Sequence, residues 1–290
     1  MTRKLYPAMV TPLADAGDSL DEGAFRPLID LLLGNGADGI FVCGTTGEGM
    51  NLDLDERKRV VRAAADALEG RGDLLVHCGA QTTRDTVALA ADAASLGVDG
   101  VAVIPPPYFP LDERELAGHL LATAKACAPT PFYIYCFTAR SGYPVPVSVV
   151  ERVRDEASNL AGLKVSESPW DKVRPYMDLG LRVFIGNEPL IAPACEAGEI
   201  AGSVSALATV FPEATRALLD DPSHRRAETV QQLRAAISHQ SLIATAKAVL
   251  ARRGLPVRPD VRAPMCALTA AEAEAADRRA ADLLGAAALR

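Results

Sequence analysis

The chain has 290 residues, of which 49% are hydrophobic and 5% aromatic, a length and composition that suit two ordinary domains or one large α/β barrel. The formal net charge of -7 argues against a nucleic-acid partner. No run approaches the roughly 18 apolar residues of a membrane span, and Met1 to Pro12 lacks the continuous apolar region of a signal peptide.

Short apolar runs alternate with helical patterns along the chain. The predicted strands are Leu5–Thr11, Gly39–Cys43, Leu74–Gly79, Gly100–Ile104, Phe132–Cys136, Leu160–Val165, Leu181–Ile185 and Ile200–Val204. Helical spacing lies between them in Phe25–Leu33, Arg57–Leu68, Thr83–Leu96, Glu113–Ala126 and Val147–Arg154. Continuously apolar strands that alternate with helices form a parallel sheet covered by helices, so eight such units predict an α/β fold of the (β/α)8 TIM-barrel type.

The remaining chain is predicted to be helical. A doubly wound open sheet is the alternative fold, but Thr11-Pro12-Leu13 stands where that fold carries a glycine-rich fingerprint. After the eighth strand, helices are predicted over Pro212–Leu219, Ala227–Arg252 and Thr269–Ala288. Because no Pro/Gly/Ser-rich linker precedes them, we expect residues 1–222 to form the barrel and 223–290 a C-terminal helical extension packed on it as one structural unit.

One lysine, Lys164, lies inside the apolar run Leu160–Val165. Burial disfavours the charged form of an amine, so its pKa is expected to fall toward neutrality. A neutral amine can form an imine with a carbonyl substrate, and the iminium acts as an electron sink for carbon–carbon bond chemistry. The alternative is a lysine at a strand end whose amine reaches the solvent.

Two further segments follow predicted strands. The first is Gly44-Thr45-Thr46-Gly47-Glu48-Gly49, which precedes a capping box of Asp53 and Glu56. Such a loop can present backbone N–H groups and hydroxyls to a carboxylate. The alternative is a simple glycine-rich turn. Alternation along Phe132–Cys136 puts Tyr133 and Tyr135 on one face. A phenol near an imine can transfer protons, and Arg140 can bind a second carboxylate. The alternative is that the tyrosines pack inside the barrel and that Arg140 is a surface charge.

The cysteines and histidines indicate the redox state of the protein and the cofactors it could use. Six cysteines occur without a C-x-x-C pair, and four histidines occur without an H-x-x-H motif. We therefore expect reduced thiols in a cytoplasmic protein, and a site that uses no metal and no cofactor.

Three motifs together resemble the dihydrodipicolinate synthase / N-acetylneuraminate lyase family of class I aldolases. They are Gly44-Thr45-Thr46-Gly47-Glu48, Tyr135 with Arg140 and Gly142, and Gly162-Leu163-Lys164. The likeness includes Lys247 and Pro259-Asp260-Val261-Arg262. It implies a barrel that assembles as a homotetramer, a dimer of dimers. The site residues that it implies are Lys164 as the Schiff-base lysine, Tyr135 as the proton shuttle, Thr45 as its relay, Thr46 as the carboxylate holder, and Gly186, Val204 and Ser205 as further binding residues.

Three segments bear on the choice of acceptor, and they point in different directions. The family's synthases carry a tyrosine pair after the fourth strand, whereas here Pro107 stands at the relay position and Tyr108 could replace it only with a one-residue loop shift. Gly186-Asn187-Glu188-Pro189 is similar to the sugar-acid lyases, which use acidic side chains there, so Glu188 is expected to bind substrate hydroxyls. Arg140 instead resembles the synthases. The acceptor therefore remains open between aspartate semialdehyde and a sugar-acid-type aldehyde.

We predict a pyruvate-dependent carbon–carbon lyase that forms a Schiff base at Lys164 with a 2-oxo acid and makes or cleaves a bond to an aldehyde. One alternative is a dehydratase or decarboxylase of deoxy-keto sugar acids that uses the same imine. Another is a non-catalytic keto-acid-binding homologue, for which Pro107 is the motivating feature. The expected partners are small-molecule substrates and further copies of the chain, with no membrane and no nucleic acid.

Overall fold

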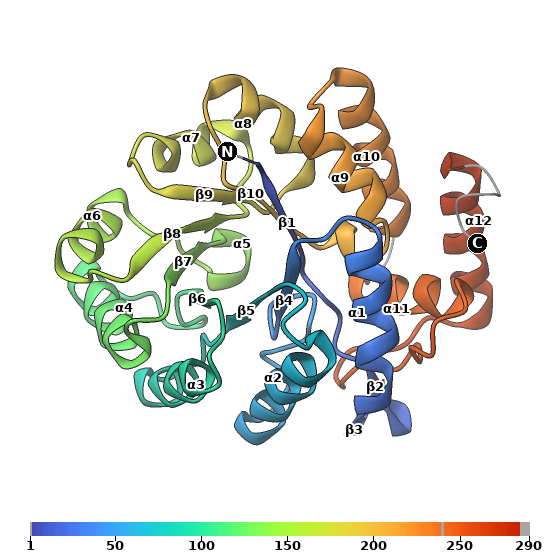
Figure 1. The fold of residues 1–290 in the computed structure, drawn as a ribbon, viewed down its shortest axis with the longest axis horizontal. Coiled ribbons are helices and arrows are strands. Elements are labelled where there is room, and N and C mark those ends of the chain that lie inside the picture. The colour runs from blue at the N-terminus through green and yellow to red at the C-terminus, as the bar shows by residue number, and fades with distance from the viewer. Residues whose placement is uncertain (1, 239–240, 285–290) are drawn as a thin grey trace.

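Eight parallel strands form the centre of the molecule in the computed structural model, which describes residues 2–238 and 241–284. They are β1 (Lys4–Pro7), β4 (Gly39–Val42), β5 (Asp73–His77), β6 (Gly100–Val103), β7 (Phe132–Cys136), β8 (Leu160–Val165), β9 (Arg182–Ile185) and β10 (Gly202–Ser205). From β4 to β10 each strand pairs with the next in the chain, and β10 pairs with β1. A β-bridge between Ala8 and Phe41 joins the two edges, so the predicted (β/α)8 barrel is confirmed (Figure 1).

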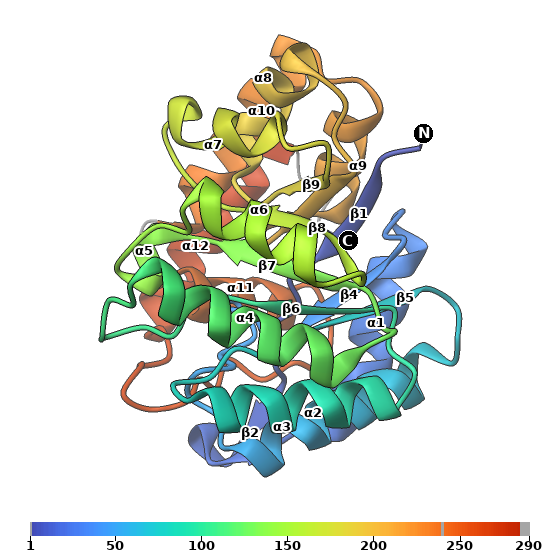
Figure 2. The same ribbon diagram turned by 90° about the vertical axis from the view of Figure 1, so that its left-hand side faces the viewer.

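Helices surround the strands on the outside of the barrel (Figures 1 and 2). They are α1 (Phe25–Gly34), α2 (Leu54–Leu68), α3 (Thr83–Ser95), α4 (Glu113–Cys127), α6 (Val147–Glu156), α7 (Trp170–Met177), α8 (Ile191–Ala197) and α9 (Pro212–Asp220). The short helix α5 (Thr138–Ser141) directly follows β7 and lies inside this ring of helices in Figure 1. The predicted capping box is present, since Asp53 accepts a hydrogen bond from the Glu56 backbone N–H and Glu56 accepts one from the Asp53 backbone N–H. This cap starts α2 three residues before the predicted start at Arg57.

The sequence patterns did not predict all of these elements. Helices α7 and α8 were missed, as was the short antiparallel hairpin of β2 (Leu13–Ala14) and β3 (Ser19–Leu20). Strand β1 ends at Pro7 and not at Thr11. These segments are short, so too few residues repeat for a period to be recognised.

Side chains alternate between the two faces of the barrel wall. Tyr133 packs inside the barrel with Tyr6 and Phe184, whereas Ile134 and Cys136 pack in the layer between the sheet and the helices. The predicted facing of β7 is therefore confirmed. In the parallel pairing of β7 with β8, Tyr135 stands opposite Lys164, and this register brings the two side chains together at the barrel mouth.

The C-terminal part of the chain contains three helices in its described residues, α10 (His224–Ile237), α11 (Leu242–Arg252) and α12 (Ala270–Leu284). They lie together on one side of the barrel, coloured orange to red in Figure 1. The prediction of one helix over Ala227–Arg252 is wrong: α10 ends at Ile237, and the hydroxyl of Ser241 accepts a hydrogen bond from the backbone N–H of Ala244 at the start of α11. Residues 239–240 and the predicted helical residues 285–288 lie outside the described ranges. Within those ranges, no helix has the length and apolar character that crossing a bilayer requires.

Candidate active site

Lys164 has a buried amine between two aromatic rings. The residue is 5% exposed, and its Nζ lies 3.8 Å from the ring centre of Tyr135 and 4.3 Å from that of Phe41. Burial lowers the pKa of Lys164 below its ordinary value of 10.5, although the neighbouring Tyr135 and Glu188 oppose the shift. The amine is therefore uncharged more often than that of a surface lysine, and the two ring faces can stabilise a cation once one forms at this nitrogen.

Tyr135 connects the lysine to a second hydroxyl. Its side chain is buried, and its phenol oxygen lies 3.5 Å from the Oγ1 of Thr45, which follows β4. A phenol in this position can give a proton to an oxygen that reacts at Lys164 and can recover it through the Thr45 hydroxyl. The Lys164 amine, the Tyr135 phenol and the Thr45 hydroxyl therefore meet at the carboxyl ends of β8, β7 and β4, the end of a (β/α)8 barrel at which active sites form.

The loop of residues 44–49 is held from three directions. The hydroxyl of Thr11 donates a hydrogen bond of 2.6 Å to the carbonyl of Gly47. The carboxylate of Glu48 accepts bonds of 2.5 Å from Lys247 Nζ and 2.7 Å from the backbone N–H of Arg262. A Cβ at Gly49 would lie 1.9 Å from the carbonyl oxygen of Cys43, so this tight turn requires glycine. These anchors fix Thr45 and Thr46 at the barrel mouth.

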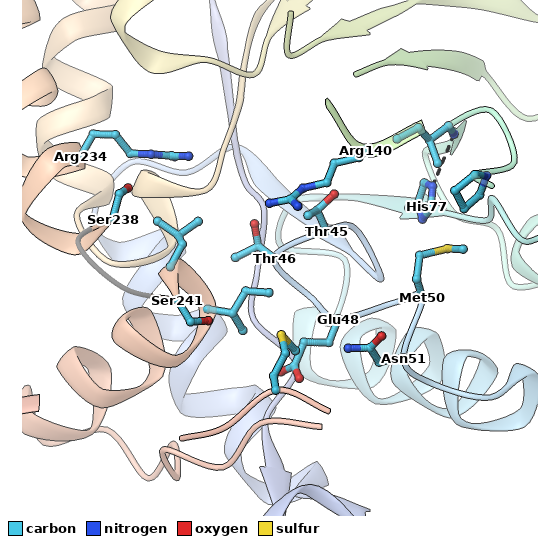
Figure 3. A pocket seen from close by; sticks show the side chains of 15 residues that line it. Thr45, Thr46, Glu48, Met50, Asn51, His77, Arg140, Arg234, Ser238 and Ser241 are labelled. Atoms are coloured by element: carbon cyan, nitrogen blue, oxygen red, sulfur yellow. Dashed lines mark hydrogen bonds between the residues drawn. The ribbon is translucent and has the colours of Figure 1, made fainter. Parts of the chain in front are cut away.

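Two cavities occupy the barrel mouth. The inner cavity, of about 210 Å³, is lined by strand ends and by the loops after them, including Thr45, Thr46, Tyr135, Arg140, Lys164, Ser166, Gly186, Asn187 and Val204. The outer cavity, of about 630 Å³, adds residues of the loop after β4 and of the C-terminal helices, including Met50, Asn51, Ser238, Ser241 and Met265 (Figure 3). Thr45, Thr46, Arg140, Arg234 and Leu242 line both, so the two cavities adjoin. A reacting group at Lys164 would face the inner cavity, and the outer cavity has room for a longer molecule.

Most of the predicted site residues come together in the inner cavity. Gly186 lies on its wall, where an added Cβ would come within 2.0 Å of the Ser166 hydroxyl, so a side chain there would disturb the cavity. Val204 lies on the same wall from β10. His77 is buried, and its two ring nitrogens lie within hydrogen-bond distance of backbone groups of Cys43 and Ile104.

Glu188 and Ser205 are placed differently from the expectation that they bind substrate directly. Glu188 is completely buried, and its Oε1 accepts hydrogen bonds from the Ser205 hydroxyl at 2.7 Å and from the backbone N–H of Leu207 at 3.0 Å. Ser205 in turn accepts a hydrogen bond from the backbone N–H of Ala208. Neither residue lines the inner or the outer cavity. The expectation that Glu188 and Ser205 bind substrate directly is therefore corrected. Their polar atoms form hydrogen bonds within the protein, and Glu188 contacts Arg234, which lines both cavities.

Tyr108 lies outside the site of its own chain. It is 84% exposed and its ring packs edge-on against that of Phe109, which is also exposed. It lines neither cavity, whereas Pro107 lines the outer one. Within the described part of this single chain, Tyr108 therefore does not complete the relay of Tyr135 and Thr45.

Arg234 and Phe41 were not predicted as site residues. Phe41 covers the Lys164 amine from β4, and Arg234 reaches the cavities from α10. Phe41 is indistinguishable from any core aromatic in sequence, and Arg234 lies in a helix that carries two other arginines, Arg225 and Arg226. Figure 3 shows the guanidinium groups of Arg234 and Arg140 extending into the outer cavity from opposite sides, with Thr46 between them in this view.

Comparison with known proteins agrees with this geometry. The model of the dihydrodipicolinate synthetase family matches residues 1–282. The chain belongs to this family. It is 34% identical to an uncharacterized DapA-like lyase of Halobacterium salinarum over 288 residues, covering 96% of this chain and 93% of that protein. It is 31% identical to the 4-hydroxy-tetrahydrodipicolinate synthase of Salinibacter ruber over 274 residues, covering 91% of this chain and 89% of that protein.

The fold is also that of a solved family structure. The sialic acid aldolase of Ruminococcus gnavus superposes with a TM-score of 0.90 at 23% identity, covering 99% of this chain and 98% of the other. The family match and the two curated relatives show that the protein is a carbon–carbon lyase of the dihydrodipicolinate synthetase family, and they confirm the resemblance inferred from its motifs.

Proposed function

We propose that this lyase is a pyruvate-dependent class I aldolase in which Lys164 forms the Schiff base. The observation that carries the proposal is the Lys164 amine, buried, lowered in pKa, and 3.8 Å from the ring centre of Tyr135. Thr45, Thr46 and the backbone N–H groups beside them would hold the carboxylate of the keto acid. Aspartate semialdehyde and sugar-acid-type aldehydes are the candidate acceptors.

The reaction uses groups that are present in the inner cavity. The Lys164 amine attacks the C2 carbonyl of pyruvate, and loss of water leaves an iminium whose charge lies beside the rings of Tyr135 and Phe41. Loss of a proton from the pyruvate methyl group gives an enamine, which attacks the carbonyl carbon of an aldehyde. Tyr135 donates a proton to the resulting alkoxide, and Thr45 relays its replacement. Water then releases the product and restores the amine.

Borohydride trapping tests this proposal. Incubation with pyruvate and borohydride is expected to add one reduced pyruvyl group to the peptide that contains Lys164, because the reduction fixes the imine as a stable amine. Lys164→Ala should abolish this label, whereas Lys125→Ala, at an exposed lysine of α4, should leave it unchanged. Absence of the label in the wild type, or equal labelling of Lys164→Ala, would remove the mechanism. Trapping without turnover of any aldehyde would instead favour the keto-acid-binding alternative that Pro107 motivates.

The pH dependence of trapping follows from the lowered pKa of Lys164. Attack requires the neutral amine, whose fraction rises with pH, so the rate of pyruvate-dependent labelling should increase as pH rises through the folded-state pKa of this lysine. Because burial lowers that pKa, half of the maximal rate should be reached below pH 10.5, the ordinary value. Mass spectrometry of the Lys164 peptide across a pH series measures the rate of labelling. A half-maximal rate at or above that pH would contradict a desolvated amine.

We also propose that the protein acts in the cytoplasm as an oligomer. All six cysteines are free thiols, four of them buried, which suits a reducing compartment. Exposed Tyr108 and Phe109 form an aromatic pair that a second copy could cover. Light scattering of the wild type and of Tyr108→Ser/Phe109→Ser tests the assembly: a monomeric wild type would contradict it.

A further inference from the structure

Arg234 is a cavity residue whose orientation is fixed by a buried carboxylate. Its Nη1 donates hydrogen bonds to Glu188 Oε2 at 3.0 Å and Oε1 at 3.3 Å. Glu188 lies in the short helix of residues 188–190, which packs against α10, and its Oε1 is itself fixed by Ser205 and by the backbone N–H of Leu207. The contact with Glu188 uses Nη1 alone, and a guanidinium carries five N–H donors. Among the described residues, no other hydrogen bond or ion pair engages this guanidinium, and it extends toward the outer cavity in Figure 3.

Arg140 supplies a second guanidinium on the opposite side. It lines both cavities, and none of the described residues forms an ion pair with it. Its guanidinium carbon lies 5.9 Å from the ring centre of Phe137. Two planar groups that face one another across a cavity can bind one carboxylate between them, each with directed N–H donors.

Most charged groups around the cavities already have partners, and the buried carboxylate of Glu167 accepts hydrogen bonds from the backbone N–H and the hydroxyl of Thr138. The Arg234–Glu188 pair is neutral, as is the buried Glu48–Lys247 pair. His77 stays uncharged because burial holds its pKa well below the ordinary value. In the imine complex, the iminium at Lys164 and the carboxylate of pyruvate cancel. Arg140, whose side chain is exposed, then remains as a guanidinium that no carboxylate of the described residues pairs with, so a negatively charged acceptor could bind it without displacing an existing ion pair.

We propose that Arg234 determines the acceptor specificity of this lyase: opposite Arg140, it donates hydrogen bonds to a carboxylate carried by the aldehyde. Glu188 holds the guanidinium at the cavity wall and does not touch the substrate. This inference rests on the proposed function, because the acceptor is defined by its reaction with the pyruvate enamine. It narrows the substrate to aldehydes that carry a carboxylate, which binds away from Lys164 at the junction of the inner and outer cavities.

Binding of two aldehydes of equal chain length tests it. The full-length protein is treated with pyruvate and borohydride, so that no aldol step can follow, and is then titrated calorimetrically with succinic semialdehyde or with butanal, which lacks the carboxylate. Arg234→Met should raise the dissociation constant for succinic semialdehyde about 10- to 100-fold, as expected for the loss of a charge-assisted hydrogen bond, and that for butanal less than about 3-fold. The matched control Arg225→Met, at an exposed residue of the same helix, should change neither constant.

Further measurements separate the possible failures. If Arg234→Met does not fold because Glu188 is left buried without its partner, Glu188→Gln/Arg234→Met removes both charges and should show the same loss for succinic semialdehyde. Equal weakening of both aldehydes, or a wild type that binds both equally, would overturn the role of Arg234. If pyruvate and borohydride give no adduct, the proposed function fails; the same titrations on the unmodified protein then still decide whether Arg234 selects a carboxylate.

Discussion

Tyr135→Phe is expected to lower aldol turnover by about 10²- to 10⁴-fold, the usual contribution of a positioned acid–base group. The ring of Tyr135 would remain over the Lys164 amine, since only the hydroxyl is removed, and the hydroxyl is the group that meets Thr45. Imine formation with pyruvate should therefore survive. Borohydride trapping and steady-state turnover, measured on the same preparation, separate these two effects.

A matched control for this variant lies two residues away on the same strand face. Tyr133 also points into the barrel, but its hydroxyl lies 3.4 Å from Arg182 and lines neither cavity. Tyr133→Phe should therefore leave turnover within about 3-fold of the wild type, because no proton of the reaction passes through this hydroxyl. Equal turnover of Tyr135→Phe and Tyr133→Phe would contradict the shuttle role, and loss of trapping in Tyr135→Phe would show that the phenol is needed before the aldol step.

Lys247→Met is expected to lower the free energy of unfolding by about 3–5 kcal/mol, the range seen when one member of a buried ion pair is removed. Lys247 and Glu48 are both fully buried, with 2.5 Å between Nζ and Oε1, so the variant leaves a carboxylate inside the protein without its cation. Lys247 Nζ also donates a hydrogen bond to the carbonyl of Asp260, which the variant removes as well. Urea unfolding followed by circular dichroism measures the change.

Two comparisons show whether the loss comes from the unpaired carboxylate. Lys247→Met/Glu48→Gln removes both charges and should recover part of the stability, because a neutral amide costs less to bury than a carboxylate. Arg152→Met breaks a pair of similar length, 2.8 Å to Glu156, whose side chains are about half exposed, and should cost less than about 1 kcal/mol. Equal losses for Lys247→Met and Arg152→Met would contradict the importance of burial. Since Glu48 anchors the loop that carries Thr45 and Thr46, Lys247→Met should also slow pyruvate trapping.

The amino-acid sequence by itself determined the barrel and the centre of its site. Strands β7 and β8 coincide with their predicted ranges, because apolar runs and their alternation are properties of neighbouring residues. The same local reasoning offered Lys164 as a buried amine, with a solvent-reaching lysine as the alternative, and placed Tyr135 on the same strand face as Tyr133. The Asp53 cap was likewise predictable, since its partner, Glu56, lies three residues later in the chain.

The tertiary structure alone decided which residues surround that centre. In the sequence Glu188 is an acidic group after a strand, but in the structure it is completely buried. Its carboxylate accepts hydrogen bonds from Ser205, from the backbone N–H of Leu207 and from Arg234, which lies 46 residues later. Lys247 meets Glu48 across 199 residues, and the ring of Phe41 covers an amine on a strand that is not adjacent to its own. No local period encodes such contacts, because they arise only when the closed barrel brings the ends of its strands and the C-terminal helices to one mouth.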